Sequence, residues 1–236
     1  MNNLLLCSGY FHQFRDLIEK SGGVTATFPK GIDLLPYLQK NNLSVYIDDG
    51  WLDLRIITTG LSIYEAITFG AGCLVQPRFQ IWGNENQRWE IIPYFSSLQC
   101  ILLPQKKVEE LMRGCAAFWE SCRKTHEEIL HFSMLNTALF HAGSGVARVC
   151  NYLWHYDALR SSDKRLPPIT QDKIMYKTLL SKSQLTRVLL QLRREGVVRT
   201  HYRSLEITDH SALQEHISRA MPDSSAPNNW REGALL

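Results

Sequence analysis

The sequence predicts an α+β fold, and three patterns in its 236 residues support that class. Short β-type runs alternate with turn signals over residues 24–103, and a helical period follows over 108–140. Two short helical patterns and two further β-type runs then fill residues 169–208. The expected parts, in chain order, are an N-terminal β-roll (residues 1–107), a long helix (108–142), a C-terminal winged helix-turn-helix (143–218) and a flexible tail (219–236).

The N-terminal part has the spacing of a β-structure made of short strands. Two β-type runs, 45–47 and 52–57, flank Asp-Asp-Gly at 48–50, and these residue types are typical of a turn. Residues 63–67 alternate in polarity, and Gly-Ala-Gly follows at 70–72 as a second turn signal. Regularly spaced short strands of this kind indicate a sandwich or a barrel.

Along the helical region, seam residues recur by four and three, which is the spacing of a heptad repeat. Such a seam is usually buried against a second helix, and a polar residue within it fixes the register of the pair. We therefore predict a homodimer held through this dimerisation helix, with packing of the helix on its own β-domain as the alternative. Gly-Ser-Gly at 143–145 should end the helix. The predicted seam consists of Phe118, Cys122, Thr125, Ile129, Phe132, Asn136 and Leu139.

The last part carries the strongest local signals. Thr170 can cap a first short helix, and Ser181 forms a capping box with Gln184 at the start of a second one. Gly196 falls where a residue with positive φ would end that second helix. Four apolar residues at i, i+3, i+4 and i+7 should form its buried face. These are Leu185, Val188, Leu189 and Leu192.

The elements around the second helix complete a recognisable order. In the first helix, Ile174 and the pair Thr178 and Leu179 should form the inward face. After the second helix, residues 197–200 and 205–208 are predicted as two strands around a basic tip. Helix, tight turn, capped basic helix and hairpin make a winged helix-turn-helix, which places its second helix in the DNA major groove.

The positive charge of the chain is concentrated in this part. Residues 160–203 hold eleven Lys and Arg against three Asp and Glu, whereas the whole chain holds 26 against 23. Concentrated cations suit the neutralisation of phosphates and the release of counterions from DNA. An apolar stripe or an arginine pair alone would indicate only a packed, solvated helix. The order of the elements and the local charge together predict DNA binding.

From residue 169 to residue 208 the chain resembles, without a gap, the DNA-binding domain of the CRP/FNR superfamily of bacterial transcription regulators. The resemblance implies a dimeric, sequence-specific regulator on a roughly palindromic site. Ser181 would then contact a phosphate. Lys182, Ser183 and Arg187 would face base edges, and an arginine suits bidentate contact with guanine. The full set of expected DNA contacts is Thr170, Gln171, Ser181, Lys182, Ser183, Gln184, Arg187, His201 and Arg203.

Three positions depart from the pattern of that superfamily. Leu179 stands where the turn usually has a glycine, Ser183 where a glutamate is common, and Tyr202 where the wing tip usually has a glycine. Because one of these positions faces base edges, we expect a half-site that differs from the family's commonest one.

Residues 24–103 also resemble the cyclic-nucleotide-binding-type sensor of the superfamily, with 28–31 and 46–50 as two of its turns and 100–103 as its closing strand. In that sensor, an arginine followed by serine or threonine binds the nucleotide phosphate. Glu90 stands at this place, and a carboxylate would repel the phosphate. The resemblance therefore implies a degenerate sensor that does not depend on cyclic AMP, and it leaves the effector open.

Other chemistry finds little support in the sequence. His126 and His131 are five residues apart, whereas the zinc-binding HExxH motif needs four. A lone histidine, His12, is more often structural than a haem ligand, and Cys7 alone cannot hold an iron–sulfur cluster. No signal peptide or membrane-spanning run is expected. We predict a cytoplasmic protein that is not an enzyme and has no metal or cofactor, with double-stranded DNA and a second copy as partners and RNA polymerase as a further candidate.

Two alternatives remain open at this point. The cysteines lack CxxC spacing, which predicts reduced thiols, but Arg113 and the pair Arg123 and Lys124 lie near some of them in sequence. A thiol-redox regulator, or one that responds to a small molecule, is therefore the first alternative. The second is a protein-interaction module that keeps the fold but does not use DNA. The six cysteines are Cys7, Cys73, Cys100, Cys115, Cys122 and Cys150.

Overall fold

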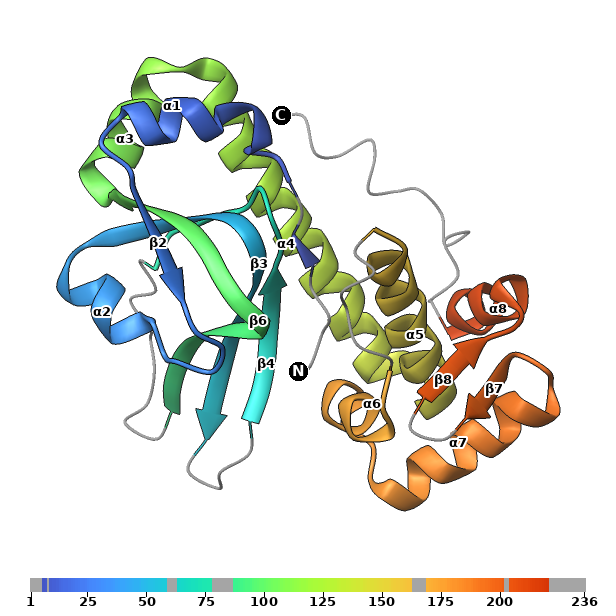
Figure 1. Cartoon of the computed structure of the whole chain (residues 1–236). Coiled ribbons are helices and arrows are strands. Elements are labelled where there is room, and N and C mark those ends of the chain that lie inside the picture. Colours follow the sequence, from blue (N-terminus) through green and yellow to red (C-terminus); the bar gives the residue numbers. More distant parts are fainter. Residues whose placement is uncertain are drawn as a thin grey trace. The chain divides into compact units, whose positions relative to one another are not determined.

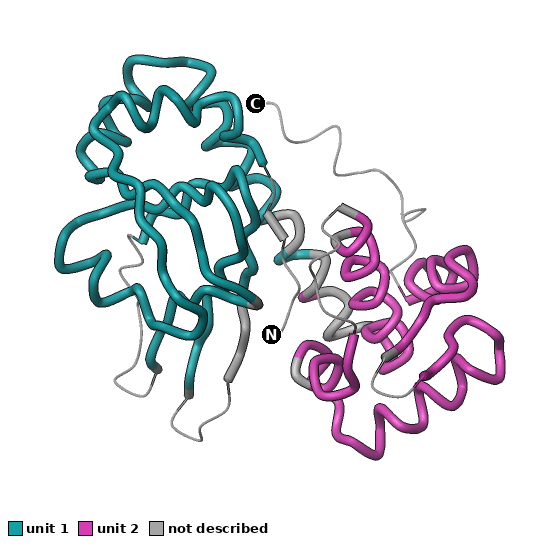
Figure 2. The backbone as a smooth tube through the Cα atoms, in the orientation of Figure 1, with its two compact units in different colours: residues 1–134 teal, residues 135–236 magenta. Residues whose placement is uncertain are grey.

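The computed structural model describes residues 6–7, 9–58, 63–77, 87–162, 169–201 and 204–220. The chain divides into two compact units, residues 1–134 and residues 135–236 (Figure 2). The first unit is built on a mainly antiparallel sheet, and the second on helices and a two-stranded hairpin (Figure 1). The α+β class predicted from the sequence is therefore confirmed. None of the helices in the described ranges is long and apolar enough to cross a membrane.

Two long antiparallel strands form the centre of the sheet, β3 (Leu43–Thr58) and β6 (Gln87–Pro104). The shorter strands are β1 (Leu6–Cys7), β2 (Val24–Phe28), β4 (Ile63–Phe69) and β5 (Leu74–Val75). Their spatial order is β1-β4-β3-β6-β2, and β5 pairs with β3 beside this path. The helical elements of this unit are a 3-10 turn (His12–Phe14), α1 (Arg15–Lys20), α2 (Leu35–Lys40), α3 (Gln105–Gly114) and most of α4 (Ala116–Ala142).

The turn predicted at 48–50 is instead part of a strand. β3 continues through Asp48, Asp49 and Gly50, and its pairing with β6 shifts register on both sides of Asp49. Gly50 has a φ of +100°, and a Cβ there would lie 3.0 Å from the carbonyl oxygen of Ser97. Residue types that favour turns also suit a β-bulge, where extra residues bend one strand against its partner. This turn prediction is therefore wrong, whereas the one at 70–72 is confirmed.

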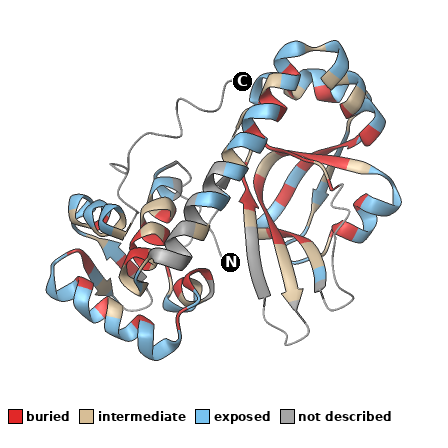
Figure 3. Ribbon diagram, turned by 180° about the vertical axis from the view of Figure 1, so that it is seen from behind, coloured by how far each residue is buried: buried red, intermediate tan, exposed pale blue. Residues whose placement is uncertain are grey.

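Two clusters of buried apolar side chains form the core of the first unit, and buried residues line its strands in Figure 3. One cluster joins the strands to α2 and includes Leu52 and Leu54. The other joins the sheet to the helices around Phe118. The ring of Phe118 packs edge-on against Phe11 and Phe14, with ring centroids 5.2 Å apart in both pairs.

The single helix predicted over residues 108–142 is divided in two. α3 and α4 are separated by Cys115, whose backbone is extended, with φ −133° and ψ 103°. A residue in that conformation cannot hold the path of an α-helix. The break predicted at 143–145 is confirmed, because α4 ends just before it.

Part of the predicted heptad seam is buried inside the chain itself. Phe118 and Cys122 belong to the second core cluster, and Thr125 beyond them is 7% exposed. Ile129 packs, partly buried, against the first cluster. The predicted dimer role is therefore wrong for the three buried residues, and the alternative of a helix packed on its own β-domain holds there. The side chains of Phe132, Asn136 and Leu139, which complete the predicted seam, lie outside the described residues.

Glu128 of α4 has a buried carboxylate oxygen that makes no hydrogen bond among the described residues. Burial raises the pKa of Glu128 above its ordinary value of 4.5, so the ionised form costs stability at neutral pH, and this cost disappears below that value. Glu128→Gln should therefore increase the free energy of unfolding by about 1 kcal/mol at pH 7 and leave it unchanged at pH 4. Urea unfolding at both pH values measures this. Glu127→Gln is the exposed comparison, and it should not stabilise the protein at pH 7 because it loses the ion pair with Arg123. Equal effects at the two pH values would contradict the explanation.

The second unit is a helix-turn-helix with a hairpin and a final helix. Its elements are α5 (Gly145–Ser162), α6 (Gln171–Thr178), α7 (Lys182–Arg194), β7 (Val198–His201), β8 (Ser204–Ile207) and α8 (His210–Ala220). β7 and β8 pair antiparallel, as the sequence predicts. α8 was not predicted, and its last two residues belong to the segment expected to be a flexible tail. The rest of that segment, 221–236, lies outside the described residues.

Candidate nucleic-acid interface

The first helix of the motif, α6, is held at both ends. Thr170 caps its N-terminus, because the Thr170 hydroxyl accepts from the backbone N–H of Lys173 at 3.4 Å. At the other end, Nη1 of Arg148, a residue of α5, donates to the carbonyl oxygen of Thr178 at 3.1 Å. Ile174 and Thr178 are buried, as the predicted inward face requires. These contacts fix the point at which the chain turns towards α7.

Leu179 joins α6 to α7 in a conformation that leucine rarely adopts. Its φ of 54° and ψ of 35° lie in the left-handed region, where a glycine would be unstrained. The side chain of Leu179 is 42% exposed, so the prediction that it faces inward with Ile174 is wrong. The turn therefore keeps the glycine geometry although the residue is not a glycine.

We expect Leu179→Gly to stabilise the second unit by roughly 0.5–1 kcal/mol. The substitution removes a left-handed strain of about 1–2 kcal/mol, and the larger freedom of glycine in the unfolded chain offsets part of the gain. Thermal unfolding measures the effect. Leu190→Gly is the matched control, because Leu190 is equally exposed but helical, and it should destabilise by about 1 kcal/mol. A destabilising Leu179→Gly would show that the leucine side chain makes a contact that outweighs its strain.

The second helix, α7, begins with the capping box that the sequence predicts. Ser181 Oγ accepts from the backbone N–H of Gln184 at 3.3 Å, and Gln184 Oε1 accepts from the backbone N–H of Ser181 at 2.9 Å. The helix ends at Arg194, and Gly196 just after its C-cap residue has a φ of +74° as predicted. The side chain of Gln184 is thus engaged in the cap, and its contact with DNA stays a prediction. The apolar stripe faces inward, with Leu185, Leu189 and Leu192 buried and Val188 partly buried.

The outward face of α7 carries cations, and the helix itself contains no acidic residue. Lys182, Ser183 and Arg187 are exposed on this face, and α7 contains no aspartate or glutamate. In the described part of the chain, neither Lys182 nor Arg187 forms an ion pair. The exposed face of α7 therefore keeps its positive charge available for an external anion.

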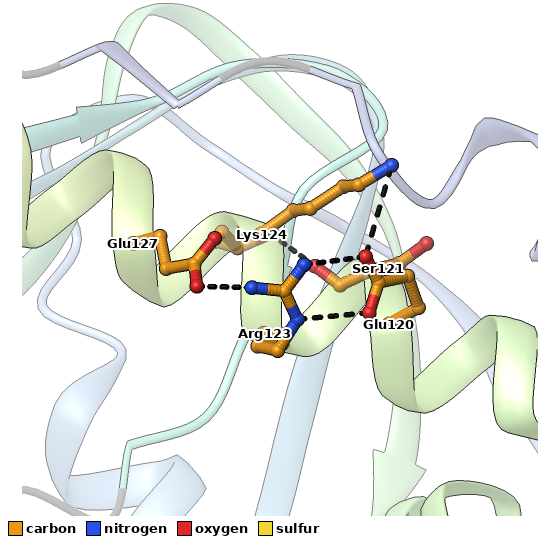
Figure 4. A network of polar contacts seen from close by, with 6 residues as sticks. Glu120, Ser121, Arg123, Lys124 and Glu127 are labelled. Atoms are coloured by element: carbon orange, nitrogen blue, oxygen red, sulfur yellow. Dashed lines mark hydrogen bonds and ion pairs between the residues drawn. The ribbon is translucent and has the colours of Figure 1, made fainter. Parts of the chain in front are cut away.

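The cations of α4 show the opposite arrangement, which Figure 4 illustrates. Arg123 contacts Glu120 at 2.6 Å and is also paired with Glu127, and Lys124 lies 3.9 Å from Glu120. Pairs spaced by three or four residues on a helix neutralise each other in this way. A basic residue on a helix is thus not by itself a binding feature in this protein, and the unpaired cations of α7 differ from these.

A groove of about 410 Å³ lies between the start of α6, the start of α7 and the wing. Four of the predicted DNA contacts line this groove together, namely Thr170, Gln171, Lys182 and His201. The first N–H groups of a helix and the positive end of its dipole suit a phosphate, and α6 presents them beside Lys182. Asp172 also lines the groove and would disfavour a second negative charge close to it.

The wing is tied both to α7 and within itself. Arg193 of α7 donates to Thr200 Oγ1 at 3.2 Å. His201 lies 3.1 Å from Glu206 on the neighbouring strand, so this predicted DNA contact already has a partner in the chain. Arg203, the other predicted wing contact, lies outside the described residues, as does Tyr202.

α8 supports the end of α7, and sequence reasoning missed it. His216 Nε2 lies 2.8 Å from Glu195 Oε2 at the end of α7, and His210 lies 2.9 Å from Asp157 of α5. The signal that could have revealed α8 is Asp209, whose side chain accepts from the backbone N–H of Ala212 at 2.9 Å and so caps the helix.

The first unit has carboxylates at the place where the resemblance implies a nucleotide phosphate. Glu90 lies 3.1 Å from Arg88, and Arg88 also lies 3.5 Å from Asp33. The other oxygen of Asp33 accepts from the backbone N–H of Ile91 at 3.1 Å. Arg88 is thus shared between two carboxylates, which reduces what it can offer to a further anion.

Five of the described cysteines form no disulfide, and all of them except Cys115 are buried: Cys73, Cys100, Cys115, Cys122 and Cys150. Burial raises the pKa of the Cys73, Cys100 and Cys150 thiols to about 12, and that of Cys122 to about 11. Arg123, which was expected to lower a thiol pKa, is bonded to glutamates instead, so that expectation is wrong for Cys122. Within the described ranges, no three histidine, cysteine or acidic side chains gather as a metal site.

Comparison with a family model identifies the second unit. Residues 147–216 match the Crp-like helix-turn-helix domain, from α5 into α8. Curated proteins give no match to the sequence. The family match includes the turn at Leu179 and the whole of α7.

Solved structures share the fold of most of the chain. A CooA mutant from Carboxydothermus hydrogenoformans has a TM-score of 0.69 at 11% identity, covering 89% of this chain and 96% of that one. CprK complexed with OCPA has a TM-score of 0.67 at 15% identity, covering 90% and 97%. A candidate transcriptional regulator of the crp/fnr family from Eubacterium rectale has a TM-score of 0.65 at 14% identity, covering 89% and 99%.

At these identities the solved structures establish the fold, and the family match establishes the domain. The chain therefore has the fold of CRP/FNR-type regulators and carries a Crp-like helix-turn-helix DNA-binding domain over residues 147–216. The resemblance predicted from the sequence is confirmed at this level.

Proposed function

We propose that this chain is a sequence-specific DNA-binding transcription regulator. The observation that carries the proposal is the exposed face of α7 beside the groove formed with α6. This face offers Lys182 and Arg187, which form no ion pair in the described part of the chain, on a helix that contains no aspartate or glutamate. A helix with these properties can enter the major groove with its N-terminal turns first. The Crp-like domain match and the regulator fold of the structural relatives support the same function.

The side chains of the interface have different expected roles. Arg187 would donate two hydrogen bonds to a guanine, and Lys182 and Ser183 would contact base edges nearer the start of α7. Contacts with phosphates fix the register of the protein on the duplex but carry little sequence information. The expected phosphate contacts are Thr170, Gln171, Ser181, His201 and Arg203, with Gln184 holding the start of the helix.

We infer that the regulator is a homodimer that uses the outward face of α4. Trp119, Leu130 and Met134 are 50%, 62% and 66% exposed. They lie eleven and four residues apart, so they share one face of the helix. Around the helix axis this face is turned from the predicted seam by about the angle between two successive residues. A second copy that presents the same face would cover these side chains about a twofold axis. Two copies of α7 would then read a roughly palindromic site with half-sites about one DNA turn apart.

The proposal includes independence from cyclic AMP. Glu90 and Asp33 share Arg88, which leaves little positive charge at this place for a cyclic phosphate. No particular contact favours a thiol signal, because the most deeply buried thiols have raised pKa values. None favours the DNA-independent module either, because Lys182 and Arg187 of α7 stay available for DNA. RNA polymerase as a partner stays a prediction.

Binding of the full chain to duplex DNA of random sequence, measured by fluorescence anisotropy at several salt concentrations, tests the proposal. The association constant should fall steeply with salt, because bound phosphates release counterions. On DNA of random sequence Lys182 has no preferred base and would pair with a phosphate, so Lys182→Gln should reduce the slope of the double-logarithmic plot by about 1. Lys124→Gln removes a charge already paired on α4 and should leave the slope unchanged. Millimolar cyclic AMP should not change the affinity. No salt-dependent binding would contradict the proposal and favour the interaction module.

A further inference from the structure

The outward face of α7 has two edges of different chemistry. Ser183 and Arg187 form a polar edge. Beside it, Leu190 is 42% exposed although it is apolar and lies well inside the helix. Seven residues, about two helical turns or 10.5 Å, separate Leu190 from Ser183, so the two side chains project from the same face. An isolated exposed leucine is common on protein surfaces, but this one lies among the residues that face DNA in the proposed function.

Thr186 extends the apolar edge by one turn. It is exposed and precedes Leu190 by four residues, which makes the two side chains neighbours on the helix surface. Its hydroxyl donates to the carbonyl oxygen of Lys182 at 2.8 Å. That hydrogen bond directs the hydroxyl at the helix backbone, so the methyl group is what Thr186 chiefly offers to a ligand. Thr186 and Leu190 together form what we name the methyl edge of α7.

The chemistry of the major groove supplies a matching partner. Of the four bases, thymine alone presents a methyl group there, at C5, and apolar side chains such as those of alanine and threonine are known to contact it. If α7 lies in the major groove, the apolar surface of Leu190 loses its contact with water. This burial is favourable only where Leu190 meets another apolar group, because a polar group buried against it would lose its hydrogen bonds to water. Guanine and cytosine edges would instead leave polar atoms unpaired against it.

We propose that the methyl edge of α7, Thr186 and Leu190, determines specificity by contacting thymine methyl groups in each half-site. The inference rests on the proposed function, since it requires α7 to lie in the major groove. It adds an apolar contact to the hydrogen bonds of Lys182, Ser183 and Arg187. Each half-site should therefore contain one or two fixed thymines beside the guanine that Arg187 contacts.

Thymine-to-uracil substitution tests this proposal, because uracil lacks only the methyl group. A duplex would first be selected from a random DNA pool with the full-length wild-type chain, and each thymine in it then replaced by deoxyuridine. We expect wild-type affinity to fall about fourfold at one or two symmetrical positions per half-site, the factor for one buried methyl group. Leu190→Ala should lose this sensitivity at one position. Thr186→Ser, which keeps the hydroxyl bond and removes only the methyl, should lose it at the position nearest Thr186.

Gln191→Ala is the matched control, because Gln191 is the exposed neighbour of Leu190 and bonds to Glu195 instead. It should keep the full uracil penalty, and thermal unfolding confirms that each variant is folded. If wild type is indifferent to uracil everywhere, or if Leu190→Ala keeps the penalty, the methyl-edge proposal is wrong while the proposed function stands. If the pool yields no preferred sequence at all, the proposed function itself fails.

Discussion

Phe118→Ala should reduce the free energy of unfolding of the first unit by about 3–5 kcal/mol, the loss typical of a buried phenylalanine. Phe118 is fully buried, and its ring packs edge-on against Phe11 and Phe14. Removing the ring would leave a cavity between α4 and the helices at the N-terminus, and the aromatic pairs would be lost as well. Urea unfolding followed by fluorescence and circular dichroism measures the change.

Trp119→Ala is the matched variant, because Trp119 is the next residue along the helix and is half exposed. It should change stability by less than about 1 kcal/mol and weaken the dimer by about tenfold or more. Sedimentation at several protein concentrations measures the dimer. If instead Phe118→Ala stays fully stable and dissociates the dimer, the seam predicted from the sequence is the true interface, and the intrachain packing of α4 is wrong.

Arg187→Ala should weaken binding to the preferred duplex by about 1–3 kcal/mol, or roughly fivefold to 150-fold, and relax the base preference at one position of each half-site. Arg187 is exposed on α7 without an ion pair in the described part of the chain, so its removal costs little stability. Binding to random-sequence duplex should change far less, because phosphate contacts dominate there.

Arg113→Ala controls for the loss of one positive charge, since Arg113 is exposed on α3 in the other unit. Anisotropy titrations on the preferred and on random duplexes separate the two effects. An Arg187→Ala variant that keeps wild-type affinity and base preference on the preferred duplex would remove Arg187 from the reading of bases.

Local signals predicted the conformation of the helix-turn-helix well. The capping box of Ser181 and Gln184 and the stop at Gly196 depend on residues only a few positions apart, so the sequence determines them directly. The left-handed turn is also kept, although Leu179 replaces the glycine that would make it unstrained. The predicted buried face of the second helix leaves out Leu190 and Thr186, but the sequence could not show that the Thr186 hydroxyl bonds to the helix backbone and leaves the methyl group as its outward feature.

The errors concern partners far apart in the chain. Asp48 and Gly50 suit a turn and a bulge equally, and the choice depends on pairing with β6, about fifty residues later. In the same way, the heptad seam predicted that one face of α4 is buried but not what covers it. Phe118 and Cys122 pack on the N-terminal helices and the sheet of the same chain, and a period alone cannot distinguish this from a second copy.

Selection of preferred sequences from a random duplex DNA pool by the purified full-length chain tests the central claim most directly. A sequence-reading α7 in a homodimer should enrich an inverted repeat whose half-sites lie about ten base pairs apart, with a guanine in each half. Repeating the selection with Arg187→Ala should lose that guanine. A pool that stays random after selection, or enrichment that is the same without Arg187, would contradict the assignment of α7 as the reading element.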